Sequence, residues 1–184
     1  MYITTFDGNP KKGTTCGGTL IASKYVISAA HCWLEVGELG VSGKLDNNAT
    51  KEDFTIYIGE HNIKKSKETF LEEKKIGVAN MHHHPDFFGI GSDHPDLTLF
   101  ELAEPVDLNV YTPACLARTT DKDKFVGRKG TIAGWGGLKN KPKKKDMPDV
   151  PYEVQLPIIE CDSKVNYSLC AGKIKGKDGC NVSI

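Results

Sequence analysis

VISAAHC, residues 26–32, holds a histidine between small residues and a cysteine, directly after the apolar start of a strand. CGGTLI, residues 16–21, precedes it with another cysteine and paired glycines. A single histidine beside a strand is more often structural than catalytic. Here the glycines, both cysteines and the small residues before His31 occur together at a fixed spacing. This combination distinguishes His31 from an isolated histidine beside a strand.

Short runs rich in β-branched and aromatic residues recur along the chain between turn signals. No segment shows a sustained helical period with caps at both ends. Many short strands without helices between them predict an all-β sandwich or barrel. A polar, turn-rich stretch at 108–124 predicts a linker between a longer first part of the chain and a shorter second part. The expected strands cover residues 2–6, 17–21, 25–29, 54–58, 75–80, 97–102 and 130–135.

Composition excludes several classes of protein. The 184 residues contain 24 basic and 24 acidic side chains, so net charge does not point to nucleic acid or to a membrane surface. No apolar run approaches the roughly 18 residues that a membrane span needs. Six cysteines are many for a reduced cytosolic chain, which favours a secreted, extracellular protein. Three glycosylation sequons, at Asn48, Asn166 and Asn181, are compatible with secretion.

The first residues do not look like a secretory leader. Residues 1–6 carry neither a basic region nor an apolar core, so they are not a signal peptide. Apolar and polar residues alternate in them, as in the middle of a β-strand. From the sequence alone, we therefore expect the chain to begin within an element.

Further motifs follow His31 in a fixed order. Together with residues 16–32 they resemble the chymotrypsin/trypsin family of serine endopeptidases, and the resemblance extends over essentially the whole chain. It implies an all-β, chymotrypsin-like fold of two six-stranded β-barrels, with the second barrel incomplete. The first barrel would cover 1–107, the interdomain crossing 108–124 and the partial second barrel 125–184. The motifs are FTIYIGEHN (54–62), HPDF (84–87), DLTLFEL (96–102), PACL (113–116), GWG (134–136), LCAG (169–172) and KDGC (177–180).

The resemblance assigns catalytic roles to His31 and Asp96. His31 would be the general base and then the general acid, a role that suits an imidazole because its unperturbed pKa lies near operating pH. Asp96 would accept the other imidazole N–H and stabilise the imidazolium. Asp93 is the nearest rival, but the apolar alternation begins at Leu97, which favours Asp96. The alternative is that Asp96 is only a turn residue after Pro95.

Asp178 falls two residues before Cys180. Trypsin-like members of the family place an acid at this position, at the base of the primary specificity pocket. The resemblance therefore implies cleavage after Arg or Lys. The alternative is an ordinary solvated turn at 177–179.

The resemblance stops after Cys180. The family continues with a Gly-Asp-Ser-Gly-Gly run that supplies the nucleophile, whereas this sequence reads NVSI at 181–184. Ser183 is not favoured as a nucleophile, because it lies one position early and lacks the flanking glycines. The opening Ile-Val-Gly-Gly type segment is absent as well. We therefore expect an inactive fragment of a trypsin-like endopeptidase. The alternative is a non-catalytic protease homologue that acts as a secreted binding or regulatory module.

The resemblance also implies two disulfides, Cys16–Cys32 and Cys161–Cys170. Cys115 and Cys180 have no family partner within this chain. On the family pattern, the partner of Cys115 would lie upstream in a pro-region, and that of Cys180 downstream.

No cofactor and no metal ion is expected. The tract HHH at 82–84 resembles a metal-ligand sequence, but its last residue belongs to the His-Pro turn and neighbouring strand residues point to opposite faces. Glu60 and Glu68 flank a loop that binds calcium in some relatives, but the lysines between them oppose a cation. A basic run at 139–145 is expected to be a solvated loop, and the alternative is an exosite for acidic partners. The expected partners are protein substrates or other proteins and protease inhibitors.

Overall fold

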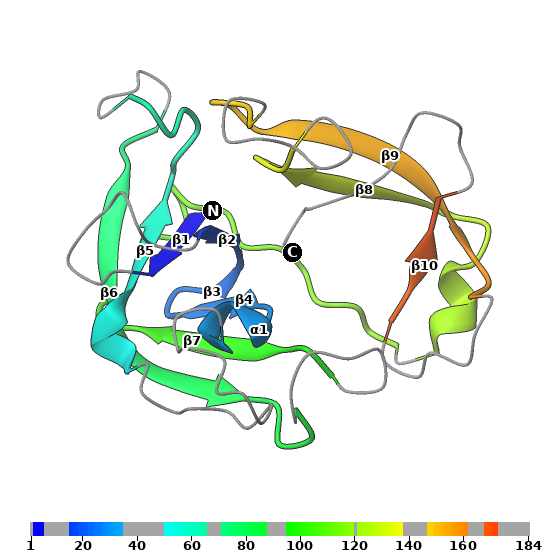
Figure 1. The fold of residues 1–184 in the computed structure, drawn as a ribbon, viewed down its shortest axis with the longest axis horizontal. Coiled ribbons are helices and arrows are strands. Elements are labelled where there is room, and N and C mark those ends of the chain that lie inside the picture. Colours follow the sequence, from blue (N-terminus) through cyan, green and yellow to red (C-terminus); the bar gives the residue numbers. More distant parts are fainter. Residues whose placement is uncertain are drawn as a thin grey trace. The chain divides into compact units, whose positions relative to one another are not determined.

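The computed structural model describes residues 2–5, 15–34, 50–65, 71–87, 95–119, 121–137, 147–161 and 168–172. Within these ranges the chain is built almost entirely of strands (Figure 1). It divides into two compact units. Unit 1 comprises Met1–Glu60 and Lys65–Cys115, and unit 2 comprises His61–Lys64 and Leu116–Ser183. No helix in the described part of the chain is both long and apolar enough to cross a membrane.

Unit 1 contains a seven-stranded antiparallel sheet in the order β2-β1-β5-β6-β7-β4-β3. The two strands at the ends of this order are neighbours in the sequence, and only Gly18 separates them. The sheet must therefore curl until its two edge strands approach each other. The strands are β1 (Tyr2–Thr5), β2 (Thr15–Gly17), β3 (Thr19–Ala22), β4 (Tyr25–Ser28), β5 (Phe54–Ile58), β6 (Lys74–His83) and β7 (Thr98–Leu102).

The core of unit 1 follows from strict alternation in its central strands. In β5 and β7 every second residue is buried, and the residues between are half-exposed. Phe54 and Phe100 meet in this core with ring centroids 5.3 Å apart and planes at 52°. Tilted aromatic pairs of this kind stabilise a core beyond the area that they bury. The buried side chains of the cluster include Leu20, Val26, Ile56, Ile58, Ile76, Val78 and Leu102.

The segment that follows β7 remains fastened to unit 1. The Tyr111 hydroxyl donates to the Glu72 carbonyl at 2.7 Å, and the Ala114 N–H donates to the Leu20 carbonyl at 2.8 Å. Burial, and to a smaller extent the Glu72 carboxylate, raise the pKa of the Tyr111 hydroxyl above its usual value of 10.0, so this donor keeps its proton. Gly59 lies against the same contact with φ +84°, and a Cβ there would come within 2.7 Å of the Glu72 carbonyl oxygen.

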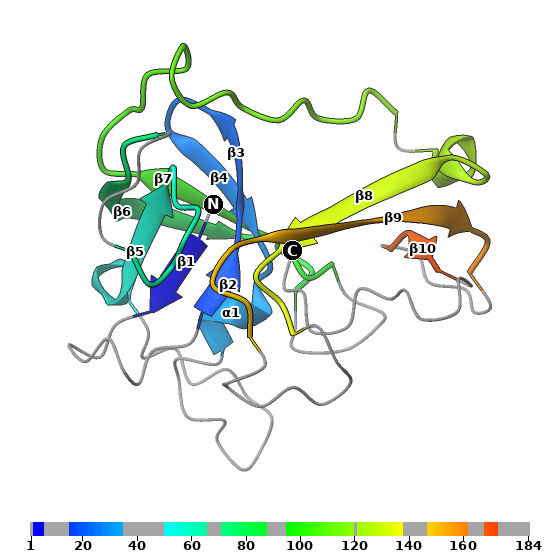
Figure 2. The ribbon, with the colours of Figure 1, turned by 90° about the horizontal axis from the view of Figure 1, so that it is seen from above.

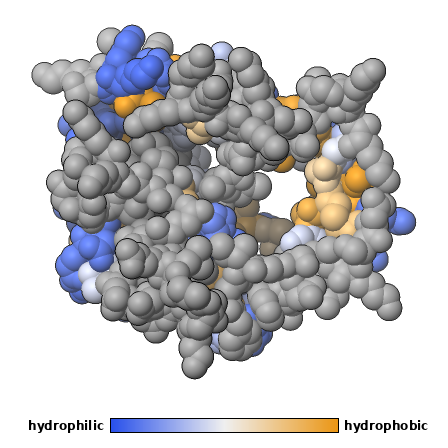
Figure 3. Space-filling view, viewed as in Figure 1, coloured by the Kyte–Doolittle hydropathy of each residue, from blue (hydrophilic) through white to orange (hydrophobic). Residues whose placement is uncertain are grey.

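Unit 2 contains a three-stranded antiparallel sheet in the order β10-β9-β8. Its strands are β8 (Lys129–Gly134), β9 (Tyr152–Ile159) and β10 (Cys170–Ala171), visible from another side in Figure 2. A single-turn 3-10 helix, η2 (Lys122–Phe125), precedes β8, and the Asp121 side chain accepts from the Asp123 N–H at its start. Alternation in β8 places half-exposed residues on one face and exposed residues on the other. Apolar surface is open to view on this unit in Figure 3.

The structure confirms the all-β fold class and corrects several strand assignments. The expected strand 17–21 is two strands, because Gly18 interrupts it between β2 and β3. The expected strand 75–80 is longer and continues through His83. β9 and β10 were not expected. Pro157 within β9 weakens the strand signal, and β10 is only two residues long. Two short helical turns, α1 (His31–Leu34) and η1 (Lys51–Asp53), were also not expected, because neither is long enough to show a period.

Candidate active site

His31 is presented by the chain immediately after a buried strand. β4 ends at Ser28, and Ala29 and Ala30 follow as small buried residues before His31 begins the single-turn helix α1. Because alanine adds only a methyl group, the chain turns close to the sheet at this point without displacing the core. The imidazole consequently stands at the end of β4 with its side chain about a quarter exposed, at 24%.

The strand register brings Asp96 to the same place. β4 and β7 are antiparallel, and Ser28 pairs with Thr98 at the end of the ladder. His31 lies just beyond Ser28, and Asp96 lies just before Thr98. In an antiparallel pair these two extensions lie at the same end of the ladder. Residues that are 65 positions apart in the sequence are therefore neighbours in space.

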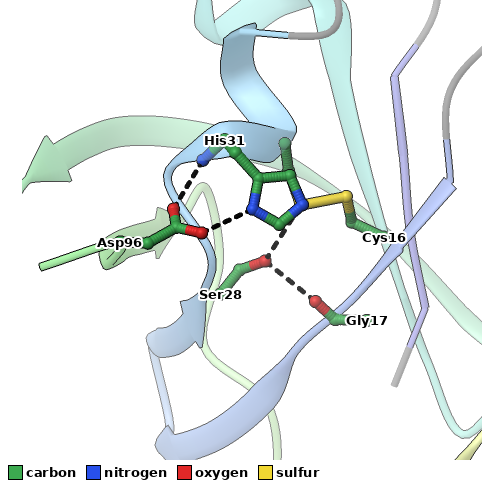
Figure 4. The surroundings of a disulfide bond; sticks show 6 residues. Cys16, Gly17, Ser28, His31 and Asp96 are labelled. Carbon is green, nitrogen blue, oxygen red and sulfur yellow. Dashed lines mark hydrogen bonds and ion pairs between the residues drawn. A yellow bond between two sulfur atoms is a disulfide. The ribbon is translucent and has the colours of Figure 1, made fainter. Parts of the chain in front are cut away.

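Asp96 holds His31 through both carboxylate oxygens (Figure 4). The backbone N–H of His31 donates to Oδ1 at 2.7 Å, and ring atom Nδ1 lies 2.5 Å from Oδ2. An ionised carboxylate can only accept hydrogen bonds, so Nδ1 carries the hydrogen in this contact. In the neutral ring, Nε2 is then the atom with a free lone pair. The arrangement can orient an imidazole as a base and stabilise it after it gains a proton.

A disulfide and a serine lie beside the imidazole. Cys16 and Cys32 form a disulfide that joins β2 to α1. The Ser28 hydroxyl donates to the Gly17 carbonyl at 2.8 Å and lies 4.0 Å from the Cys32 sulfur. Nε2 of His31 lies 3.9 Å from the same sulfur. One covalent bond and one partly buried hydrogen bond therefore fix β2 against the segment that carries His31.

Sequence reasoning missed Ser28. Its side chain is almost fully buried, at 1% exposure, in a strand whose other inward residue is Val26. A hydroxyl at an inward position of an apolar strand needs a hydrogen-bond partner, and that requirement was the signal that could have drawn attention to it.

Several predicted site residues fall outside the described part of the chain. These are the specificity residue Asp178, the rival carboxylate Asp93, the serine Ser183, the second calcium-loop acid Glu68 and Cys180, together with the basic run 139–145 and the three sequons. Of the remaining cysteines, Cys161 and Cys170 form the second disulfide that the resemblance implied, and Cys115 is exposed and without a disulfide partner among the described residues.

The three consecutive histidines take different partners. Nε2 of His82 lies 3.9 Å from a Glu101 carboxylate oxygen, and Nδ1 of His83 lies 3.0 Å from the Thr98 hydroxyl. Nδ1 of His84 accepts from the Asp86 N–H at 3.2 Å. Burial lowers the pKa of His83 below its usual 6.5, and the neighbouring His82 adds to the effect. The first two rings therefore contact side chains of the neighbouring strand β7, and the third stabilises the turn that follows β6.

Comparison with known proteins adds evidence from the sequence. The trypsin family model matches residues 3–181. Serine protease filzig of Drosophila melanogaster is 32% identical over 188 residues, which cover 90% of this chain and 9% of filzig. Coagulation factor IX of Oryctolagus cuniculus is 29% identical over 180 residues, which cover 94% of this chain and 59% of that protein. The venom protease of Bombus pensylvanicus is 31% identical over 184 residues, with 93% and 68% covered. The chain thus spans less than two thirds of filzig and of coagulation factor IX.

Proposed function

Because the chain belongs to the trypsin family of serine proteases, whose fold is a double β-barrel, we propose that it carries the general base of a trypsin-like endopeptidase. The observation that carries this proposal is the two-point contact between Asp96 and His31. The reaction is hydrolysis of peptide bonds in protein substrates through an acyl-enzyme. Units 1 and 2 would correspond to the two barrels, with the crossing at 108–124.

His31 has two tasks in this mechanism. Nε2 takes the proton of the nucleophile's hydroxyl while the oxygen forms a bond to the substrate carbonyl carbon. Nε2 then gives that proton to the departing amine nitrogen as the C–N bond breaks. A water molecule repeats the sequence to release the acid. Asp96 keeps Nδ1 protonated throughout, and its negative charge stabilises the imidazolium from 2.5 Å away.

The nucleophile is the part of the mechanism that residues 1–184 do not supply. The sequence after Cys180 is NVSI, without a Gly-Asp-Ser-Gly-Gly run. A base has no effect without a nucleophile to deprotonate. In an analogous triad on a different fold, loss of the serine alone lowers turnover about a millionfold. We therefore expect a polypeptide of this sequence to be inert on its own toward peptide and ester substrates.

Asp178 supports a preference for substrates with Arg or Lys before the cleaved bond. A carboxylate in a pocket is tolerated when a cation pairs with it, and a basic substrate side chain would be that cation. The support for this assignment is its sequence position two residues before Cys180.

Two disulfides support secretion, because such bonds persist in oxidising compartments. Protein substrates and protease inhibitors are the partners that follow from the proposed activity. The sequence at 181–184 also supports a second candidate, a secreted protease homologue that binds or regulates other proteins without hydrolysing them.

The decisive experiment compares the 184-residue chain with a chimera that has two changes. The residues after Asn181 are replaced by the Gly-Asp-Ser-Gly-Gly segment and the strands that follow it in a relative, and an activation site with an Ile-Val-Gly-Gly type segment is placed before the first strand. A serine-directed phosphonate should label the chimera stoichiometrically and leave the native chain unlabelled. In the chimera, His31→Ala should lower kcat about a millionfold. Asp96→Asn should lower it about ten-thousandfold.

Three results would change the conclusion. Labelling of the native chain that Ser183→Ala abolishes would identify Ser183 as the nucleophile. A folded chimera without activity would favour the binding or regulatory homologue. An active chimera that prefers aromatic residues, or keeps its preference after Asp178→Ser, would remove the specificity assignment.

A further inference from the structure

The proposed base and two side chains beside it bring together atoms that can bind a metal ion. The sulfur atoms of Cys16 and Cys32 and an imidazole nitrogen of His31 all lie within 4.8 Å of one another. In the structure the two sulfurs are joined as a disulfide. We propose that reduction of this disulfide creates a zinc-binding site formed by Cys16, Cys32 and His31.

The donor set suits zinc, and the distance between the Cys32 sulfur and the imidazole nitrogen is already close to the one that zinc requires. Zinc in proteins binds thiolate sulfur at about 2.3 Å and imidazole nitrogen at about 2.0–2.1 Å, usually in tetrahedral geometry. Those bond lengths separate a sulfur and a nitrogen ligand by about 3.6 Å. The Cys32 sulfur lies 3.9 Å from Nε2 of His31, so a shift of a few tenths of an ångström completes that pair. Cys16 adds the second sulfur once the covalent bond is broken and the two sulfurs move apart from 2.05 Å to the roughly 3.8 Å that two thiolates on one zinc ion require.

The imidazole is already oriented as a zinc ligand. A histidine that binds zinc commonly donates its other ring N–H to a carboxylate, which fixes the tautomer and makes the ligand more basic. Asp96 provides this contact at Nδ1, and Nε2 is the atom that faces the disulfide. The support that a zinc site needs behind its histidine is therefore present before any metal binds.

The burial of the three side chains determines which coordination position of the zinc ion remains open to solvent. Cys16 and Cys32 are almost completely buried, at 3% and 0% exposure, whereas the His31 side chain is partly exposed. The two sulfurs and one nitrogen would occupy three tetrahedral positions from the protein side. Because His31 is the exposed member of the three, a water molecule would reach the ion from its side and take the fourth position.

The chemistry requires a reductant, and a small dithiol is sufficient. The dithiol gives two electrons and two protons to the Cys16–Cys32 bond and becomes a disulfide itself. Zinc then displaces the two thiol protons and binds two thiolates and a neutral imidazole. A zinc ion on Nε2 would prevent His31 from accepting a proton. This loss of base function rests on the proposed function, whereas zinc binding does not.

The test uses the full chain with Cys115, Cys161, Cys170 and Cys180 changed to serine, so that only Cys16 and Cys32 remain as thiols. The protein is reduced with dithiothreitol, freed of reductant under nitrogen and titrated with Co²⁺ as a spectroscopic probe, then with Zn²⁺ in competition. We expect one metal ion per reduced chain, with thiolate-to-cobalt charge-transfer bands and tetrahedral d–d bands. The oxidised chain should show neither.

Variants identify the ligands. Cys32→Ser and His31→Ala should remove the tetrahedral cobalt spectrum, and Asp96→Asn should weaken zinc binding about 10- to 100-fold. His82→Ala, in the same background, should change nothing. Cobalt binding that survives His31→Ala would overturn the proposal, as would a reduced chain that keeps the far-ultraviolet circular dichroism of the oxidised chain and binds no cobalt. If reduction unfolds the chain, zinc must restore the near-ultraviolet signal, and failure to do so would equally overturn it.

Discussion

The two units use the same strand pattern with different results. In β5 of unit 1 the inward residues are buried, and in β8 of unit 2 the corresponding residues are only half-buried. Among the described residues, the buried apolar side chains lie in unit 1 with the exception of Leu156 in β9. Alternation therefore decides which face of a strand points inward, but burial depends on a second surface that covers this face.

The site residues lie in the unit with the closed core. His31 extends from β4 and Asp96 precedes β7, and both strands contribute residues that are fully buried. A general base must be held within a fraction of an ångström of its working geometry, and packed strands provide that precision. If this comparison is right, the two units should respond differently to matched changes.

The largest predicted effect on the free energy of unfolding comes from a matched pair of leucines, one in each unit. Leu102 in unit 1 and Leu156 in unit 2 have exposures of 0% and 1%. Leu102→Ala should lower the free energy of unfolding by about 4 kcal/mol, because the dense core around it cannot collapse into the cavity. Leu156→Ala should cost about 2 kcal/mol, because its half-exposed neighbours can relax.

Hydrogen exchange measured by mass spectrometry, peptide by peptide, can assign each loss to its unit. Leu102→Ala should accelerate exchange in β5, β6 and β7, and Leu156→Ala in β8 and β9. Equal losses for the two variants would show that unit 2 is packed as tightly as unit 1, and the comparison would fail.

Two glycines give a second matched pair. Gly59 and Gly127 have nearly the same left-handed backbone, with φ of +84° and +82°. A Cβ at Gly59 would collide with the Glu72 carbonyl oxygen at 2.7 Å, whereas a Cβ at Gly127 has nothing within 4 Å. Gly127→Ala should cost about 1 kcal/mol from backbone strain alone.

Gly59→Ala should cost about 3 kcal/mol, because steric overlap adds to the strain. Urea denaturation of the two variants, with the same m-value as the native chain, would measure the difference. Similar losses for both alanines would mean that the contact between Gly59 and the Glu72 carbonyl relaxes at little cost.

The smallest effect should be a dependence on acid that is confined to unit 1. Burial, with a smaller contribution from His82, lowers the pKa of His83 in the folded chain below 6.5. As pH falls below 6.5, the unfolded chain binds a proton before the folded chain does, so folded stability decreases until pH has passed the folded pKa. The stability that depends on neutral His83 is therefore fully present above its unfolded pKa and is lost as pH falls through 6.5 and then through the lower folded pKa.

Unfolding measured at a series of pH values should therefore show a slope that His83→Gln reduces. His82→Gln should leave most of the slope, since burial is the larger cause of the shift. A slope that is unchanged in His83→Gln would assign the acid sensitivity to other groups.

Much of unit 1 could be predicted from residue patterns. The strand expected at 54–58 has those bounds in the structure, because alternating apolar and polar residues lie between clear turn signals. β6 was underestimated because His82 and His83 are not typical strand residues, although their pairing with β7 holds them in the ladder. β9 was missed because proline usually marks an edge or an end of a strand, whereas Pro157 lies inside one.

For the candidate site, the sequence suggested the residues but not the geometry that brings them together. The resemblance implied His31 and Asp96, but the pairing of Ser28 with Thr98 that brings them together depends on strand register. The contact of Asp96 with the His31 backbone N–H depends on the turn after Ala30, and the bond from Ser28 to Gly17 joins two strands that are separate in the sheet order. Contacts of this kind arise from tertiary packing, which a single sequence does not encode locally.

Two hydrogen bonds, one from Ala114 and one from Tyr111, determine how a mechanical force on the connecting segment would reach unit 1. A pull applied through Leu116 and the residues that follow first meets the bond from the Ala114 N–H to the Leu20 carbonyl, and then the bond from Tyr111 to the Glu72 carbonyl. Both lie between the point of pulling and β7, the strand that follows Asp96. A force on the segment that follows Leu116 therefore loads these two hydrogen bonds before it reaches β7 and the Asp96 carboxylate that contacts His31.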